Sequence, residues 1–257
     1  MKRRNFMKAA GLLALTPAVT SLAATQESHT AEKQIYEYRI YSLTGNNTEV
    51  LDEYLGNCMI PAYNRMNIFA GAFKNYKQED DQIRSILLIY PNITAYHKAK
   101  TSLWNDFVFR KAAQAYFDAT AVKPAFTKID TYLAEAFDSV PQLRRPLSKR
   151  TMFEMRVYQS PNEEANKRKI KMFNEGEIAL FDKTGVNSVC YGDILAGPGM
   201  AALLYLTWSE NDDLRNAAWK AFSSHPDWKA MAADKQYANS ATNNKSTLLL
   251  PMDYSQL

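Results

Sequence analysis

The sequence predicts an α+β protein made of two ferredoxin-like (βαββαβ) repeats. The pattern Glu-x-Arg-x-Tyr occurs in "IYEYRIY" at 35–41 and again in "MFEMRVY" at 152–158. The elements expected after each of these strands come in the same order, which indicates an internal repeat. Residues 138–150, "DSVPQLRRPLSKR", are rich in proline and basic side chains and are typical of a linker. The order strand, helix, strand, strand, helix, strand in each half is the split βαβ plan.

The first repeat is expected over residues 34–137, and its elements follow from local patterns. After the strand at 35–41, Asn46 and Glu49 are spaced as in a capping box, which marks the start of a helix. Two strands follow, and the second is nearly continuously apolar, which favours a central position in the sheet. A second helix begins after Asn92, a natural N-cap. The two middle strands and the closing strand are expected at 71–77, 83–91 and 126–133.

The second repeat is expected over residues 151–257 and carries similar signals. Ser160 followed by Pro161 marks the start of its first helix, because proline is favoured at the first helical position. A second helix is expected after Ser209, and Pro226 should break it, since proline lacks the N–H of the helical hydrogen bond. The two middle strands and the closing strand are expected at 188–195, 202–209 and 246–252.

Residues 1–24 have a basic start, an apolar middle and small residues at the end, which is the pattern of a secretory signal peptide. Their "RRNFMK" resembles a twin-arginine signal, so we expect export to the periplasm or the medium of a bacterium. The apolar run is too short for a transmembrane span and is interrupted by Pro17, so we expect no stable membrane insertion after signal removal. Residues 25–33 are polar and are expected to be a flexible N-terminus of the mature chain.

The composition favours a globular protein with a substantial core and excludes several kinds of site. Four of the 31 Lys and Arg residues lie in the leader, which leaves 27 against 27 Asp and Glu. Because no basic patch stands out, nucleic acid is not expected as a partner. Cys58 and Cys190 have no metal spacing and can be two buried thiols or one disulfide. No motif predicts a metal, and no cofactor is expected.

Trp219 and Phe222, followed by "HPDW" at 225–228, are expected on a late helix, and together with the repeated strand motif they resemble the NIPSNAP family. In the first half, Asn105, Asp106 and Phe107 match the family's late helix only loosely. The resemblance covers about 34–135 and 151–252, which is nearly the whole mature chain. The second-half residues that carry it are Trp219, Phe222, Pro226, Asp227 and Trp228.

The resemblance implies the dimeric α+β-barrel arrangement, in which two ferredoxin-like units pack sheet to sheet into an eight-stranded barrel with helices outside. A chain with two units could close that barrel within itself, and a homodimer is the alternative. Related barrels include cofactor-free quinol-type monooxygenases, polyketide-tailoring enzymes and haem-binding chlorite dismutases, but the NIPSNAP family implies no settled reaction. We interpret Asp227 and Trp228 of the motif as structural, a helix start and an aromatic core anchor.

The side chains of each opening strand alternate between two faces. We expect the purely apolar sets to pack against the helices, namely Tyr36, Tyr38, Ile40, Phe153, Met155 and Val157. The charged sets should then point into the barrel, where each buried charge needs a partner. These candidate ligand-binding residues are Glu37, Arg39, Tyr41, Glu154, Arg156 and Tyr158.

Two interpretations of the charged sets remain open. They can form a structural ion-pair network that ties the two repeats together. They can instead line a polar pocket in which Arg39 or Arg156 binds an anionic or carbonyl oxygen and the tyrosines donate hydrogen bonds. In that pocket Glu37 or Glu154 would act as a base if burial raised its pKa.

Three classes of function therefore survive. The chain can bind a small organic molecule in or beside the barrel, which is the function we favour. It can be a cofactor-free oxygenase, isomerase or lyase that acts through these Glu, Arg and Tyr side chains. It can also be a structural or interaction protein whose interior is filled. Haem held by His97 or His225 is a weaker alternative than a surface or capping role for these histidines.

Overall fold

The computed structural model describes residues 32–43, 48–77, 82–147 and 152–257, and within these ranges eight antiparallel strands close into a barrel. The first half contains β1 (Ile35–Ser42), α1 (Thr48–Glu53), η1 (Tyr54–Met59), α2 (Ile60–Asn64), β2 (Phe69–Asn75), β3 (Ile83–Tyr90), α3 (Ile93–Asn105), α4 (Phe107–Ala112), α5 (Gln114–Phe117) and β4 (Lys128–Ala136). The second half contains β5 (Met152–Gln159), α6 (Glu163–Met172), η3 (Phe173–Glu177), α7 (Ile178–Thr184), β6 (Asn187–Ala196), β7 (Ala202–Ser209), α8 (Asp212–Ser224), α9 (Pro226–Ala233), η4 (Lys235–Tyr237) and β8 (Asn243–Pro251). The predicted α+β fold class is confirmed.

The strand order explains how the barrel closes. Around the barrel it runs β1-β3-β2-β8-β5-β7-β6-β4, and β4 pairs with β1. Each half therefore contributes four neighbouring strands in the ferredoxin-like order, and two pairings, β2 with β8 and β4 with β6, join the halves. Because every strand has two neighbours, the described barrel closes within one chain and leaves no sheet edge open.

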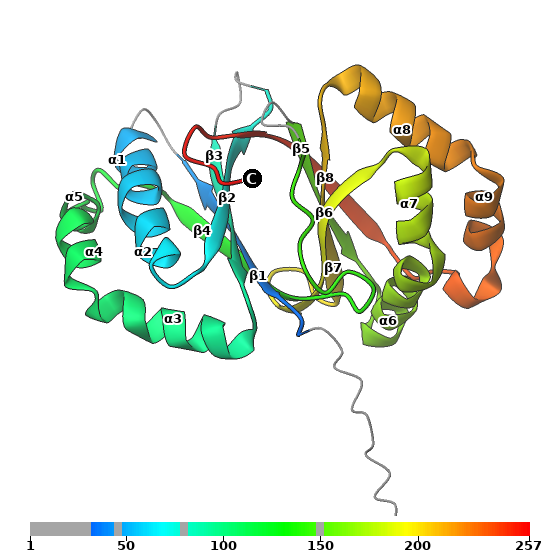
Figure 1. The fold of residues 1–257 in the computed structure, drawn as a ribbon, viewed down its shortest axis with the longest axis horizontal. Helices are drawn as coiled ribbons and strands as arrows, with labels where there is room; N and C mark the ends of the chain where they lie inside the picture. The colour runs from blue at the N-terminus through cyan, green and yellow to red at the C-terminus, as the bar shows by residue number, and fades with distance from the viewer. Residues whose placement is uncertain (1–31, 44–47, 78–81, 148–151) are drawn as a thin grey trace, which may run out of the picture. The chain divides into compact units, whose positions relative to one another are not determined.

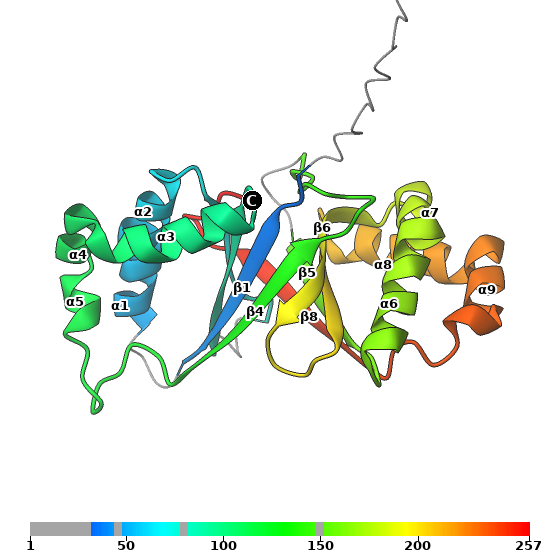
Figure 2. The same ribbon diagram turned by 90° about the horizontal axis from the view of Figure 1, so that it is seen from below.

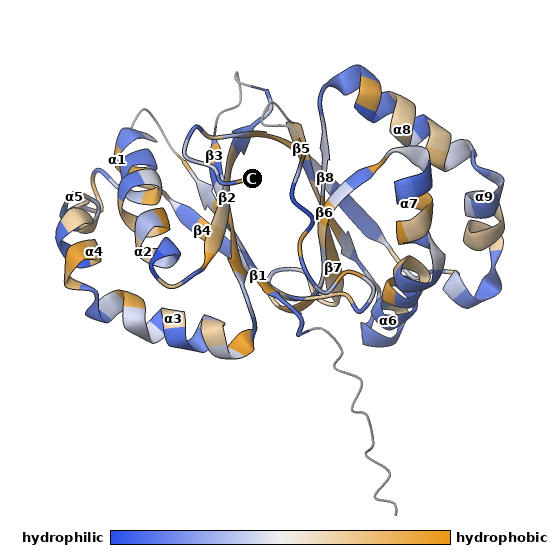
Figure 3. Cartoon of the chain, in the orientation of Figure 1, coloured by the Kyte–Doolittle hydropathy of each residue, from blue (hydrophilic) through white to orange (hydrophobic). Residues whose placement is uncertain are grey.

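The helices cover the outside of the barrel (Figures 1 and 2). α1 to α5 lie on the side of the first-half strands and α6 to α9 on the side of the second-half strands, and α4, α5 and α9 lie farthest from the sheet. Figure 3 shows that these helices carry both hydrophilic and hydrophobic residues, as expected for helices with one buried and one solvated face. None of the helices in the described ranges has the length and apolar character needed to cross a membrane.

Asparagine side chains start the main helices. Asn92 accepts a hydrogen bond from Ala95 N, as predicted, whereas in the second half Asn162 and Asn211 are the caps instead of Ser160 and Ser209. An asparagine side chain can accept from the third residue of the helix and so satisfies an N–H that has no helical partner. The expected cap Asn46, the leader and the end of the linker lie outside the described residues.

The interior of the barrel is filled by apolar side chains from all eight strands. Tyr36 and Tyr38 of β1 belong to this cluster, together with Phe153, Met155 and Val157 of β5. Contacts cross between the halves, as the ring centroids of Phe73 and Phe153 lie 4.9 Å apart.

The predicted orientation of the opening strands is therefore wrong. The apolar sets face the barrel interior, and the charged sets, Glu37/Arg39/Tyr41 and Glu154/Arg156/Tyr158, face the helices. The enclosed interior is lined mainly by apolar side chains and offers a charge few partners, whereas the covering helices supply lysine, arginine, tyrosine and tryptophan side chains. Since β1 and β5 are four strands apart in the barrel, the two charged sets point away from each other and do not form one network.

Candidate functional site

In the first half, the charged set forms a cluster between β1 and the helices in which the charged groups hydrogen-bond to one another and to neighbouring side chains. The Glu37 carboxylate accepts hydrogen bonds from Arg39 Nε at 2.9 Å, Tyr90 Oη at 2.6 Å and Lys100 Nζ at 2.7 Å. The other two nitrogens of Arg39 reach Met59 Sδ at 3.6 Å and Tyr63 Oη at 3.2 Å. All three nitrogens of this guanidinium are therefore used within the protein.

Glu37 is an ionised structural group. Burial alone would raise the pKa of its carboxyl, but the positive charges of Arg39 and Lys100 outweigh burial and lower the pKa to about 2. The third predicted residue of this set, Tyr41, is buried beside Arg39 with its ring edge-on to Phe126.

In the second half, Glu154 occupies the same register position as Glu37 and is also fully partnered. Its carboxylate accepts from Arg156 Nε at 2.6 Å, Arg215 Nε at 2.6 Å and Trp219 Nε1 at 3.1 Å, and from Ser246 Oγ. Burial opposes ionisation, but these partners lower the pKa of Glu154. The condition under which Glu37 or Glu154 would act as a base, a pKa raised by burial, is therefore not met, and a carboxylate with a lowered pKa binds a proton weakly.

Arg156 differs from Arg39 in how its nitrogens are used. Its Nη1 donates to Tyr158 Oη at 3.0 Å, and Tyr205 Oη donates to the same oxygen at 2.7 Å. The indole of Trp219 lies over the guanidinium with its centroid 3.9 Å from Cζ, a cation–π contact. The remaining nitrogen, Nη2, makes no hydrogen bond to any residue that the structure describes.

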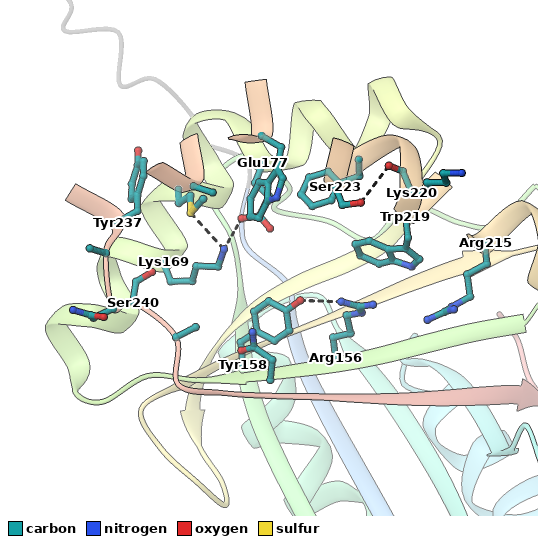
Figure 4. Close-up of a pocket in the computed structure, with 18 residues that line it drawn as sticks. Arg156, Tyr158, Lys169, Glu177, Arg215, Trp219, Lys220, Ser223, Tyr237 and Ser240 are labelled. Atoms are coloured by element: carbon teal, nitrogen blue, oxygen red, sulfur yellow. Dashed lines mark hydrogen bonds and ion pairs between the residues drawn. The ribbon is translucent and has the colours of Figure 1, made fainter. Parts of the chain in front are cut away.

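Arg156 and Tyr158 form part of the wall of a pocket of about 700 Å³ between the sheet and the helices of the second half (Figure 4). This volume lies in the range of small-molecule sites. Four cationic side chains and one carboxylate line it, together with five aromatic rings. The main lining residues are Arg156, Tyr158, Lys169, Glu177, Arg215, Trp219, Lys220, Phe222, Trp228 and Tyr237.

A buried ion pair that the sequence reading missed lies in this pocket. Lys169 Nζ on α6 donates to Glu177 Oε2 on η3 at 2.7 Å, and the two side chains are only 7% and 3% exposed. Burial raises the pKa of Glu177, against the lowering effect of the Lys169 charge. The rings of Phe173, Trp228 and Tyr158 surround the ammonium at 4.8, 5.5 and 5.9 Å.

A sequence signal for this pair exists. Lys169, Phe173, Glu177 and Phe181 are spaced four residues apart, so they share one face of a helix. The two phenylalanines mark that face as buried, and two opposite charges on a buried face predict an ion pair.

The remaining predicted residues have structural positions. His225 is the N-cap of α9, where its Nδ1 accepts from Asp227 N at 3.1 Å, and His97 lies exposed on α3. Asp227 lies near Lys183 at 3.4 Å, whereas Trp228 packs on Phe222 and also lines the pocket. Cys58 and Cys190 are buried free thiols, and the part of the chain described here has no cluster of three metal-ligating side chains.

Residues 153–256 match the model of the NIPSNAP family, so the second half contains a NIPSNAP domain. In structure the chain is similar to a protein from Lactobacillus acidophilus that is provisionally named a monooxygenase, with a TM-score of 0.57, 11% identity, and coverage of 86% of this chain and 94% of that one. It is also similar to an anthrone oxidase-like protein, with a TM-score of 0.53, 10% identity, and coverage of 87% and 93%. No functionally curated protein matches the sequence. At these identities the two likenesses establish the barrel fold alone.

Proposed function

We propose that this protein is exported and binds a small organic anion in the pocket between β5, α6 and α8. In this proposal the first half is also a NIPSNAP-like repeat, and together with the second half it completes the barrel. Export rests on the leader-like pattern of residues 1–24, and detection of the mature chain in a periplasmic or culture fraction tests it.

The observation that carries the binding proposal is the difference between the two corresponding arginines. Arg39 uses all three nitrogens within the protein, whereas Arg156 keeps Nη2 without a partner among the described residues and lines a pocket. Arg215 of α8 also lines the pocket and uses Nε and Nη1 for Glu154 and Asn216, which leaves its Nη2 available. Two guanidinium groups that offer N–H donors to one space favour a carboxylate or a similar anion.

The walls favour an aromatic body for this anion. Trp219 and Phe222 of α8, Trp228 of α9 and Tyr158 of β5 provide ring faces and edges around the pocket. Aromatic rings pack against one another with offset-stacked or edge-on geometry and contribute more than buried area alone. A planar aromatic carboxylate therefore fits both the charge and the surface chemistry of the pocket.

Calorimetric titration with 2-naphthoate tests the proposal, with uncharged 2-naphthylmethanol as the matched ligand. We expect the carboxylate to bind more tightly than the alcohol, and Arg156→Met to weaken it by roughly 10- to 100-fold, since a hydrogen bond to a charged group contributes about 1.5–3 kcal/mol. Arg39→Met is the control, because it removes the corresponding arginine of the closed cluster and should leave affinity unchanged. Equal binding of acid and alcohol, or an equal loss in both variants, contradicts the proposal.

A second candidate function is an enzyme that uses Glu177 as a general base without a cofactor. It is supported by a carboxylate that lines the pocket and has a pKa raised by burial, since such a group holds a proton more readily near neutral pH. Anthrone, which loses a C–H proton and reacts with O2 to give anthraquinone and water, is a suitable probe. Oxygen uptake that depends on the protein and is lost in Glu177→Gln supports this candidate, and uptake no faster than in buffer rejects it.

A further inference from the structure

The Lys169–Glu177 pair occupies a specific place in the proposed binding pocket. Figure 4 shows the pair beside Tyr158, on the side opposite Arg215, with Arg156 and Trp219 between them. Both members of the pair line the pocket, and so do both arginines. The pocket thus has a cationic end at Arg156 and Arg215 and a second polar end at Lys169 and Glu177.

The first half shows that the fold does not require this ion pair. The helices before β2 and β6 end alike: Ile68 N donates to Tyr63 O, and Val186 N donates to Phe181 O. Counted back from these two acceptor residues, Lys169 lies where Leu51 lies and Glu177 lies where Met59 lies. Leu51 and Met59 are both fully buried, so apolar side chains fill these positions in the other half.

Burying two charges has a large desolvation cost, and the first half fills the same positions with apolar side chains. Packing alone therefore does not explain why the second half has an ion pair here. Lys169 Nζ can donate three hydrogen bonds. Among the described residues it donates to Glu177 Oε2 at 2.7 Å and, weakly, to Met172 Sδ at 3.4 Å. The second carboxylate oxygen, Glu177 Oε1, has no hydrogen bond to any described residue. The pair therefore offers a donor and an acceptor side by side to the pocket.

We propose that the pocket selects organic anions that carry a hydroxyl group at the end remote from the anionic group. The hydroxyl donates its proton to Glu177 Oε1 and accepts a hydrogen bond from Lys169 Nζ, while the anionic group pairs with Arg156 and Arg215. A hydroxyl is the smallest group that is both donor and acceptor, and it satisfies both members of the pair at once. This inference rests on the proposed function and names its ligand class as hydroxylated aromatic acids.

The inference predicts strong discrimination against ligands that lack the hydroxyl. Such a ligand covers Lys169 and Glu177, excludes water and leaves both groups without a new partner. Sites built to hydrogen-bond a hydroxyl reject the analogue without it for this reason. We expect 6-hydroxy-2-naphthoate to bind roughly 10- to 100-fold more tightly than 2-naphthoate, and 4-hydroxybenzoate to exceed benzoate in the same way. In 3-hydroxy-2-naphthoate the hydroxyl lies beside the carboxylate and should bring no such gain.

The test is calorimetric titration of the full chain and of the double variant Lys169→Leu/Glu177→Met, which carries the first-half residues. The double variant should lose the preference for the remote hydroxyl, because apolar side chains at these positions no longer penalise a ligand that lacks it. Lys171→Gln/Glu175→Gln removes an exposed pair on the same helix, where Nζ and Oε2 are 3.7 Å apart, and should keep the preference. If wild type binds 2-naphthoate but shows no preference, or if the double variant keeps the preference, the inference is overturned and the proposed function stands. If wild type binds none of these acids, both are overturned.

Discussion

The buried Lys169–Glu177 pair gives a sharp prediction about stability. Replacement of both residues by their first-half counterparts, Lys169→Leu with Glu177→Met, should leave the protein as stable as before or more stable. Leu51 and Met59 are fully buried at these positions in the first half, so the local packing accepts apolar side chains of this size. Replacement of a buried ion pair by well-packed apolar residues is often neutral or stabilising by about 1–4 kcal/mol.

Each single substitution should be much more costly. Lys169→Leu leaves the Glu177 carboxylate buried without its ammonium, and Glu177→Met leaves the ammonium alone. Loss of one partner of a buried pair typically costs about 3–5 kcal/mol. At roughly 2–4 °C per kcal/mol for a chain of this size, each single variant should lower Tm by roughly 6–20 °C.

Urea unfolding followed by circular dichroism, on the wild type, both single variants and the double variant, gives the interaction free energy as a double-mutant cycle. With two single losses of about 3 kcal/mol or more and a double variant that is neutral or stabilised, we expect an interaction free energy of about 6 kcal/mol or more for this pair. The same cycle at the exposed pair Lys171–Glu175 should give about 0–1 kcal/mol, because solvent screens it. A double variant that loses the sum of the two single losses would refute the reasoning, since the pair would then be required by the fold.

Three further predictions concern other described residues. The pKa of Glu37 is lowered to about 2, so the ionised carboxylate stabilises the fold above its unfolded pKa near 4.5, and this stabilisation is lost as the pH falls toward 2. Glu37→Gln should therefore remove up to roughly 3 kcal/mol of the acid-induced loss of stability, measured by urea unfolding at pH 7 and pH 2.5. A variant with the same pH profile as the wild type would contradict this. Tyr158→Phe removes the acceptor of the buried Tyr205 hydroxyl and should lower the free energy of unfolding by about 1–3 kcal/mol, whereas no change in the urea midpoint would show that the hydroxyl is satisfied elsewhere. Cys190 is buried, and its pKa is raised to about 12. Iodoacetamide at pH 8 should therefore leave it unmodified in the folded protein and label it in urea. Rapid labelling of the folded protein, detected by mass spectrometry, would contradict its burial.

Much of the fold follows from short-range patterns in the sequence. The alternation in "IYEYRIY" and "MFEMRVY" identifies two opening strands, and the order of the elements after each gives the ferredoxin-like plan. The assignment of the two faces failed because alternation distinguishes a polar from an apolar face without saying which one is enclosed. In a closed barrel the interior is the more dehydrated side, so the apolar residues Tyr36, Tyr38 and Phe153 belong there.

The candidate site could be predicted only in part. Arg156 and Tyr158 were identified because they repeat Arg39 and Tyr41 in the sequence, and they do line the pocket. The difference between the two arginines depends on what the helices place beside them, which no strand pattern contains. Lys169 and Glu177 look like ordinary charges of an amphipathic helix until the buried phenylalanines on the same face are considered.

The duplicated plan gives each residue of the pocket an internal reference. Counted from the N-caps Asn92 and Asn211, Lys100 and Trp219 occupy the same helix position, and both bind the carboxylate of the opening strand. In the first half, a lysine there completes a closed charge cluster around Glu37. In the second half, an indole completes the cluster around Glu154 and also covers the guanidinium of Arg156. The carboxylate–arginine pair of the opening strand is thus common to both halves. The residues that differ between the halves, among them Lys169, Glu177 and Trp219, line the pocket and give Arg156 surroundings that Arg39 lacks.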